Sequence, residues 1–226
     1  MTGAALPATP TVPDELVERA AALVGTGRRA LLGVVGAPGS GKSTFVAGLV
    51  SALAGRLDGG PAAVAHVPMD GFHLADQALD RLGLRARKGA PETFDAAGYA
   101  ALLRRVRSET GTTVYAPAFE RDIEQPLAGA IAVPPVARLV VTEGNYLLLD
   151  GPWADVRELL SEVWFVQVDD QTRVRRLVAR HVLFGKTHDE AVDWVRTVDQ
   201  PNADLVDRTA ALADLVVSLD EVSHLG

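Results

Sequence analysis

Residues 31–44 read L-L-G-V-V-G-A-P-G-S-G-K-S-T, and this stretch decides the fold. Its first five residues form a short apolar run, which is typical of a strand buried in a parallel sheet. From Gly36 to Ser43 the spacing is G-x-x-x-x-G-K-S, the Walker A pattern. Because an apolar strand precedes this loop and a helix is predicted after it, we expect a phosphate-binding loop in an α/β sheet.

The residue types in this loop suit a nucleoside triphosphate. The glycines permit the backbone angles that aim successive N–H groups at the phosphates. Lys42 can reach the β- and γ-phosphates, and the Ser43 hydroxyl can hold Mg²⁺. A helix that begins near Ser43 points its positive end at the same anion. The predicted nucleotide contacts in the loop are Gly36, Ala37, Pro38, Gly39, Ser40, Gly41, Lys42, Ser43 and Thr44.

Length and composition limit the classes of protein. A chain of 226 residues with 48% hydrophobic residues suits one α/β domain, and we expect a tail over 1–13 and a single domain over 14–226. The formal net charge of −7 argues against a nucleic-acid partner. No apolar run approaches the roughly 20 residues of a membrane span, and the absence of cysteine fits a cytoplasmic location. No sequence feature demands a homodimer, which stays open.

Two acids follow predicted buried strands. Asp70 follows the strand over 62–69 and Glu143 follows the strand over 138–142, and open α/β sheets bind ligands at such strand ends. Asp70 is predicted to be the general base that accepts the proton of an acceptor hydroxyl, although an aspartate here could simply cap the next turn. Glu143 resembles a Walker B acid that holds a water on Mg²⁺, although many strands end in glutamate.

Three arginines share one face of a predicted helix over 171–183. Arg173, Arg176 and Arg180 stand at i, i+3 and i+7. We predict a lid over about 171–200 that brings guanidinium groups to the transferring phosphate, with Arg176 and Arg180 catalytic and Arg173 on the nucleotide. The alternative is an ordinary amphipathic helix with a solvated basic side.

The middle of the chain offers candidates for contacts with a phosphate acceptor, each with an ordinary structural alternative. The basic cluster around Arg87 could be solvated surface, and Asp95 is predicted to cap a helix over 96–107. A polar loop over 117–122 could close on a substrate, or its Phe119 could belong to the core. A short edge strand is expected over 131–133. The candidate acceptor contacts are His73, Arg87, Lys88, Asp95 and Phe119.

Several stretches together resemble the P-loop small-molecule kinases that include uridine kinase, phosphoribulokinase and bacterial pantothenate kinase. They read G-A-P-G-S-G-K-S-T, M-D-G-F-H, R-K-G-A-P-E-T-F-D, A-P-A-F-E, T-E-G-N-Y-L-L and T-R-V-R-R-L-V-A-R-H. The chain most resembles the compact bacterial branch called nucleoside/nucleotide kinase-like or fructose-transport kinases. The resemblance implies a three-layer P-loop NTPase fold, with a parallel sheet of about five strands flanked by helices and a small helical lid.

The resemblance also implies an activity, namely transfer of the γ-phosphoryl group of ATP, with Mg²⁺, to a hydroxyl of a small molecule such as a nucleoside or sugar. R-K-G-A-P-E-T-F-D is similar to a stretch of pantothenate kinase, so that activity is an alternative. The loop after Pro117 lacks the Tyr and His that uridine kinases usually carry. A nucleotide-binding module without turnover and an NTPase are further alternatives. The sequence leaves open the acceptor and the choice of ATP over GTP.

Overall fold

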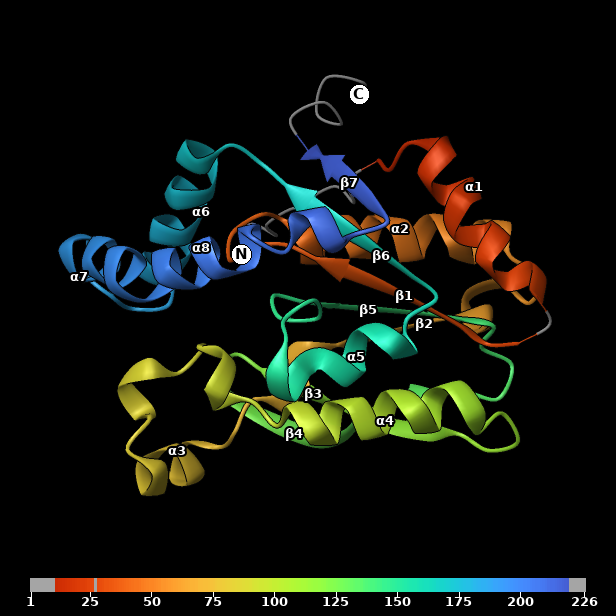
Figure 1. The fold of residues 1–226 in the computed structure, drawn as a ribbon, viewed down its shortest axis with the longest axis horizontal. Coiled ribbons are helices and arrows are strands. Elements are labelled where there is room, and N and C mark those ends of the chain that lie inside the picture. The colour runs from red at the N-terminus through yellow and green to blue at the C-terminus, as the bar shows by residue number, and fades with distance from the viewer. Residues whose placement is uncertain (1–10, 27, 220–226) are drawn as a thin grey trace, which may run out of the picture.

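The computed structural model describes residues 11–26 and 28–219 of the chain. Their centre is a five-stranded sheet in the order β2-β5-β1-β6-β7, in which every neighbouring pair is parallel (Figure 1). The strands are β1 (Ala30–Val35), β2 (Val64–Pro68), β5 (Leu139–Gly144), β6 (Glu162–Gln167) and β7 (Leu215–Ser218). The predicted parallel sheet of about five strands is confirmed. Most of the predicted tail (1–10) and residues 220–226 lie outside the described residues.

Helices cover both faces of this sheet and complete three layers (Figure 1). α1 (Asp14–Ala22) and α2 (Lys42–Arg56) pack on one face, and α4 (Ala96–Ser108) and α5 (Ala154–Leu159) pack on the other. The remaining helices are α3 (Asp76–Leu82), α6 (Asp170–Leu183), α7 (His188–Trp194) and α8 (Gln200–Asp207). No helix among the described residues is long and apolar enough to cross a membrane.

The central strand β1 shows why the sheet needs helices on both faces. All of its residues are buried, and successive side chains point to opposite faces. Leu32 and Val34 pack in the core formed with α1 and α2, whereas Leu31 and Val35 pack in the core formed with α4 and α5. Since neither face of the strand meets water, nearly every position carries an apolar side chain.

An antiparallel hairpin of β3 (Val114–Glu120) and β4 (Gln125–Val133) forms a second, separate sheet that lies against β2. The predictions of a loop over 117–122 and of a short edge strand over 131–133 are therefore wrong in extent. Residues 117–120 continue β3, and residues 131–133 only end a longer strand. The register shifts around Pro117, which has no N–H group to give to a ladder, and this proline hid the continuation of β3 from residue 117 onward.

The chain beyond β6 is mostly helical, as predicted, but its helices are divided differently. Within the segment predicted as a lid, α7 continues through a π-helical turn (Val195–Asp199) into α8. The Thr187 hydroxyl accepts from the Glu190 N–H, while the Glu190 carboxylate accepts from the Thr187 N–H, and this capping box fixes the start of α7. A π turn adds a residue to one helical turn and is frequent at functional sites.

Candidate functional site

The loop between β1 and α2 has the backbone geometry of a phosphate cradle. Gly39 and Gly41 have φ angles of +80° and +92°, which residues with side chains rarely adopt. At Gly36 a Cβ atom would lie 2.6 Å from the carbonyl oxygen of Val166, so the loop passes too close to β6 for a side chain. The loop leads directly into α2 at Lys42, so the positive end of the helix dipole lies at the cradle.

Ser43 and Glu143 meet beside this loop although they are 100 residues apart in sequence. The Ser43 Oγ atom donates a hydrogen bond of 2.9 Å to Glu143 Oε1. The pairing of β1 with β5 sets Val34 opposite Glu143 and so brings this carboxylate to the loop. Burial raises the pKa of the Glu143 carboxyl group, and the positive charge of Lys42 partly offsets this rise.

The donor set at Ser43 and Glu143 fits Mg²⁺. This ion usually keeps several waters and takes only one or two protein oxygens together with the phosphates of a substrate. The described part of the chain has no group of three or more His, Cys, Asp or Glu side chains that could hold a metal ion. A hydroxyl and one buried carboxylate therefore suit a metal that a nucleotide helps to bind.

Asp70 stands at the carboxyl end of β2, in a 3₁₀ turn (Met69–Phe72). Because β2 pairs with β5, with Pro68 opposite Glu143, this turn lies next to the P-loop. The turn crosses β3 so closely that a Cβ atom at residue 71 would lie 2.3 Å from the carbonyl oxygen of Pro117. Glycine at position 71 therefore allows the turn that carries Asp70 to contact the hairpin.

Charged groups from three segments surround Asp70. The Nη2 atom of Arg121, from the turn between β3 and β4, lies 3.6 Å from Asp70 Oδ2. Burial lowers the pKa of Lys42, while the carboxylates of Glu143 and Asp70 oppose this change. Two acids, one lysine and one arginine thus share the space in front of the P-loop.

Aromatic rings and two unsatisfied polar atoms lie beyond Asp70. The ring of His73 stacks on Phe94 with 3.9 Å between centroids, and it lies 4.7 Å from the ring of Phe119. Burial lowers the pKa of His73 to about 4, so this imidazole is neutral at pH 7. Within the described chain, His73 Nδ1 and Asn145 Oδ1 are buried without a hydrogen-bond partner. Such atoms call for a partner, which a bound ligand could supply.

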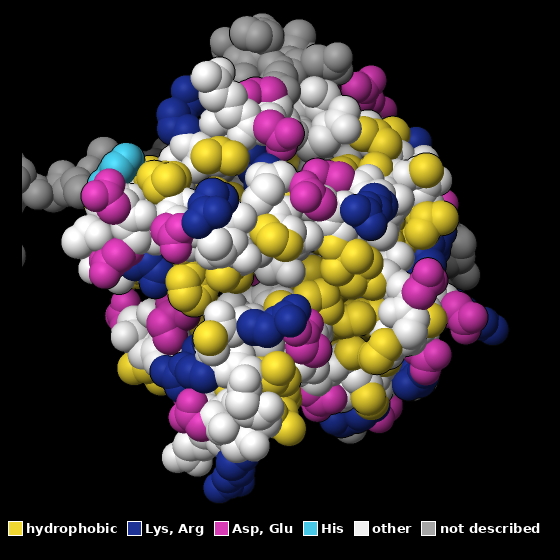
Figure 2. Space-filling model, turned by 60° about the vertical axis from the view of Figure 1, so that its left-hand side comes forward, with side chains coloured by type: hydrophobic (Ala, Val, Ile, Leu, Met, Phe, Trp, Pro, Cys, Tyr) yellow, Lys and Arg dark blue, Asp and Glu magenta, His cyan; other side chains and the backbone are white. Residues whose placement is uncertain are grey.

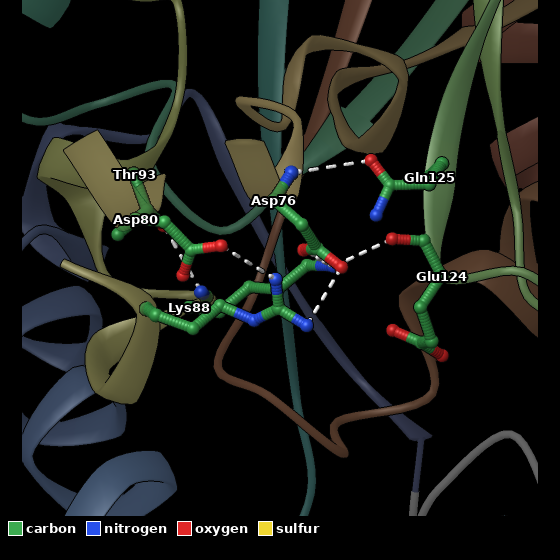
Figure 3. Close-up of polar contacts among 8 residues, drawn as sticks. Asp76, Asp80, Lys88, Thr93, Glu124 and Gln125 are labelled. Atoms are coloured by element: carbon green, nitrogen blue, oxygen red, sulfur yellow. Dashed lines mark hydrogen bonds and ion pairs between the residues drawn. The ribbon is translucent and has the colours of Figure 1, made fainter. Parts of the chain in front are cut away.

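Lys88 belongs to a closed polar network between α3 and the hairpin. Its Nζ atom donates to Asp76 Oδ1 at 2.8 Å and to the carbonyl oxygen of Glu124 at 2.5 Å (Figure 3). Arg85 Nη2 lies 2.8 Å from Asp76 Oδ2, so one carboxylate pairs with two cations. The backbone N–H of Asp76 also donates to the side chain of Gln125, which ties the start of α3 to the start of β4.

Two of the predicted acceptor contacts lie away from these groups. The Arg87 side chain is exposed and pairs with Glu92 at 2.6 Å. The Asp95 carboxylate accepts a hydrogen bond from the N–H of Gly98, which confirms the predicted helix cap. Neither Arg87 nor Asp95 lines the pocket that contains the other candidates.

The three arginines of α6 have different surroundings. Arg180 lines the pocket, and burial is the largest cause of its lowered pKa. Arg176 Nη1 donates to the carbonyl oxygen of Ser40 at 3.4 Å, which sets it against the P-loop. Arg173 is buried, and its Nη2 donates to the side chain of Gln200 at 2.5 Å. Arg173 does not line the pocket, but its Cγ atom would lie 3.2 Å from a Cβ atom at Gly39 of the loop, and its predicted nucleotide contact stays a prediction.

One pocket of about 900 Å³ joins these parts. The pocket extends from the P-loop past Asp70. Its part that is lined by residues between 70 and 145 is here called the acceptor end. Residues of α6 and α7 also line the pocket. Phe184, Lys186 and Trp194 belong to this lid lining, and the Lys186 Nζ atom lies 4.5 Å from the ring centroid of Trp194. On the face drawn in Figure 2, Lys and Arg side chains are interspersed with Asp and Glu side chains, and neither the positive nor the negative side chains form a continuous patch.

Sequence reasoning missed several pocket residues. Asn145 carried a usable signal, because it follows Glu143 by two residues at the same strand end. Asp76 carried no such signal. Arg121 lies in the segment 117–122 that we expected could close on a substrate, but its position beside Asp70 depends on the pairing of β3 with β4.

The comparisons with known proteins agree with this geometry. No family model matches the chain. The Schizosaccharomyces pombe protein named "Putative uridine kinase C227.14" is 36% identical over 211 residues, covering 90% of this chain and 89% of that protein. Protein YggC of Escherichia coli K12 is 34% identical over 195 residues, covering 86% of this chain and 79% of its own length.

Solved structures show the same likeness. The structure described as a "putative fructose transport system kinase" from Silicibacter sp. TM1040 has a TM-score of 0.75 and 37% identity, covering 84% of this chain and 90% of that one. YFH7 of Saccharomyces cerevisiae, described as "a putative P-loop containing kinase with a circular permutation", has a TM-score of 0.77 at 19% identity and supports the fold alone. That match covers 91% of this chain and 98% of the yeast one.

Proposed function

We propose a specific reaction for this chain, which belongs to the uridine kinase-like family of P-loop kinases: it transfers the γ-phosphoryl group of ATP to a hydroxyl group of a nucleoside or sugar. The observation that carries the proposal is the neighbourhood of Asp70, which has the P-loop on one side and the acceptor end of the pocket on the other. An acceptor hydroxyl beside this carboxylate would also be near a phosphate bound in the loop.

Each charged group has a role in this reaction. ATP supplies the phosphoryl group, and Ser43 and Glu143 would hold Mg²⁺, which would offset the negative charge of the phosphates. Lys42 binds the phosphate oxygens, and Asp70 accepts the proton of the acceptor hydroxyl as its oxygen attacks phosphorus. Arg176 and Arg180, from α6, stabilise the charge that develops on the transferred group.

Arg121 adds a positioning role to this set. Its guanidinium group lies 3.6 Å from the Asp70 carboxylate, and the hairpin that carries it is held by the Lys88 contact with Glu124. A charge pair at this distance favours one orientation of the carboxylate, as a positioned proton acceptor requires. We therefore assign to Arg121 the orientation of Asp70 rather than direct contact with the reacting atoms.

Release of ADP from Mg-ATP tests the proposal. The assay compares the protein alone with the protein plus uridine, cytidine, other ribosides, fructose, related sugars and pantothenate. Strong stimulation by a nucleoside or sugar supports the proposed reaction and names its acceptor class. Fast release without any acceptor contradicts it in favour of an NTPase, and tight ATP binding with no release contradicts it in favour of a binding module.

A further inference from the structure

The positive side chains at the acceptor end are already neutralised. Lys88 and Arg85 share the carboxylate of Asp76, whose side chain is 22% exposed, and Figure 3 shows Lys88 beside Asp76. Arg121 lies beside Asp70. The residues that line this end carry three cations and a larger number of carboxylates. These carboxylates belong to Asp70, Asp76, Asp122 and Glu124. A substrate anion would therefore meet a region of slightly negative formal charge.

Lys88 in particular is not free to bind an anion. Its side chain is 15% exposed, and two of its three N–H donors are already used by Asp76 and by the carbonyl oxygen of Glu124. The ammonium group also lies 5.5 Å from the ring centroid of Phe119. Turning Lys88 toward a substrate would leave the charge of Asp76, a side chain that is 22% exposed, with less compensation, which is unfavourable.

The buried polar groups that remain available at the acceptor end are uncharged. His73 Nδ1 and Asn145 Oδ1 are the buried polar atoms of this end that have no hydrogen-bond partner within the described chain. The Phe94 and Phe119 rings beside them offer flat apolar surface. A few uncharged hydrogen-bonding atoms against aromatic rings suit a ring compound with hydroxyl or amide groups.

We propose that the acceptor is uncharged, and that Asp76 is the residue that enforces this choice by neutralising Lys88 and Arg85. The proposal rests on the kinase reaction proposed above and narrows its acceptor to a neutral ring compound with hydroxyl groups. Acceptors that carry a carboxylate or phosphate are disfavoured, since they would compete with Asp76 for its two cations.

Matched pairs of acceptors test the charge preference. One member of each pair carries a carboxylate, which replaces a ring hydrogen of uridine in orotidine and a hydroxymethyl group in the other two pairs: uridine and orotidine, glucose and glucuronate, panthenol and pantothenate. The measured quantity is kcat/KM from acceptor-dependent ADP release by the full chain. We expect the neutral member to be favoured by about tenfold or more, which corresponds to about 1.4 kcal/mol. An equal or greater kcat/KM for the anionic members would overturn the proposal.

Two aspartate variants test the role of Asp76. Asp76→Asn should free Lys88 and Arg85 and lower the neutral-to-anionic ratio of kcat/KM by about tenfold. Asp80→Asn is the matched control, because Asp80 is exposed, lies 3.8 Å from Arg85 and makes no contact with Lys88. The control should leave the ratio unchanged. A folded Asp76→Asn protein with the wild-type ratio would contradict the assignment, and the thermal unfolding midpoint shows whether each variant is folded.

A binding measurement separates this proposal from the kinase reaction. If no pair supports ADP release, the proposed reaction fails for these acceptors, but the charge preference can still be measured. Calorimetry with the same pairs, in the presence of a non-hydrolysable ATP analogue and Mg²⁺, gives the ratio of dissociation constants directly. Tighter binding of the neutral members supports the inference, and equal or tighter binding of the anionic members, or no binding of either, refutes it.

Discussion

The two ends of the pocket are built in different ways. At the P-loop end, consecutive residues from Gly36 to Ser43 form the phosphate cradle. Their backbone angles set its shape, and the dipole of α2 gives it a positive potential. At the acceptor end, side chains come from the turn after β2, from α3, from the β3–β4 hairpin and from the strand end at Asn145. Phosphate binding is therefore a local property of the chain, whereas selection of the acceptor depends on how several elements pack together.

This difference separates two kinds of mutation. A change in the loop should alter nucleotide affinity, because the same few peptide groups form the whole cradle. A change at the acceptor end should alter turnover or acceptor choice while ATP still binds, because its groups stand on other elements. The predictions that follow test this separation.

Asp70→Asn should have the largest effect. The amide cannot accept the hydroxyl proton, so phosphoryl transfer should fall by about a hundredfold or more, while ATP affinity stays close to that of the wild type. Acceptor-dependent ADP release and equilibrium binding of an ATP analogue measure the two quantities. Near-full turnover would show that Asp70 is not the base. A loss of ATP affinity together with turnover would show that the acceptor end also contributes to nucleotide binding.

Gly39→Ala should damage the P-loop end alone. The residue has a φ of +80°, and its Cβ atom would lie 2.7 Å from Leu177 Cγ and 2.9 Å from the carbonyl oxygen of Arg173. The loop must shift, so we expect ATP affinity to fall by about tenfold or more. Gly55→Ala, in α2 with no atom within 4 Å of its Cβ position, is the control and should add up to about 1 kcal/mol of stability. Wild-type ATP affinity in Gly39→Ala would show that the loop geometry is not needed.

Arg121→Gln should have a smaller effect, confined to turnover. Losing the charge that orients Asp70 should lower kcat by about threefold to tenfold, with little change in the KM for ATP or for the acceptor. Arg121→Lys should restore most of the activity, since it keeps the charge. An unchanged kcat in Arg121→Gln, or a change in KM alone, would exclude the positioning role.

The smallest effect concerns stability and pH. Burial lowers the pKa of His66, in β2, and of His73 to about 4 in the folded chain, against an ordinary value of about 6.5. Between these values the unfolded chain binds protons that the folded chain does not, so stability is full above about pH 6.5 and falls toward pH 4. Lowering the pH from 7 to 5 should cost about 2 kcal/mol for each imidazole.

Urea unfolding of His66→Leu isolates this contribution from that of the carboxylates. The variant should lose about 2 kcal/mol less than the wild type between pH 7 and pH 5. His188→Gln, an exposed change at the start of α7, provides the surface control. Equal losses in His66→Leu and the wild type would show that His66 is not the titrating group.

The sequence alone determined the phosphate-binding half of the protein. The sequence pattern identified the Walker A loop and the apolar strand before it, because both depend on local geometry. It also identified Glu143, which the parallel pairing of β1 with β5 brings to Ser43. The tertiary structure decided the other half. The antiparallel pairing of β3 with β4, which continues past Pro117 where we expected a loop, brings Arg121 to Asp70 and the Glu124 carbonyl to Lys88. Spacing within one chain cannot encode such contacts, because they depend on how separate elements pack.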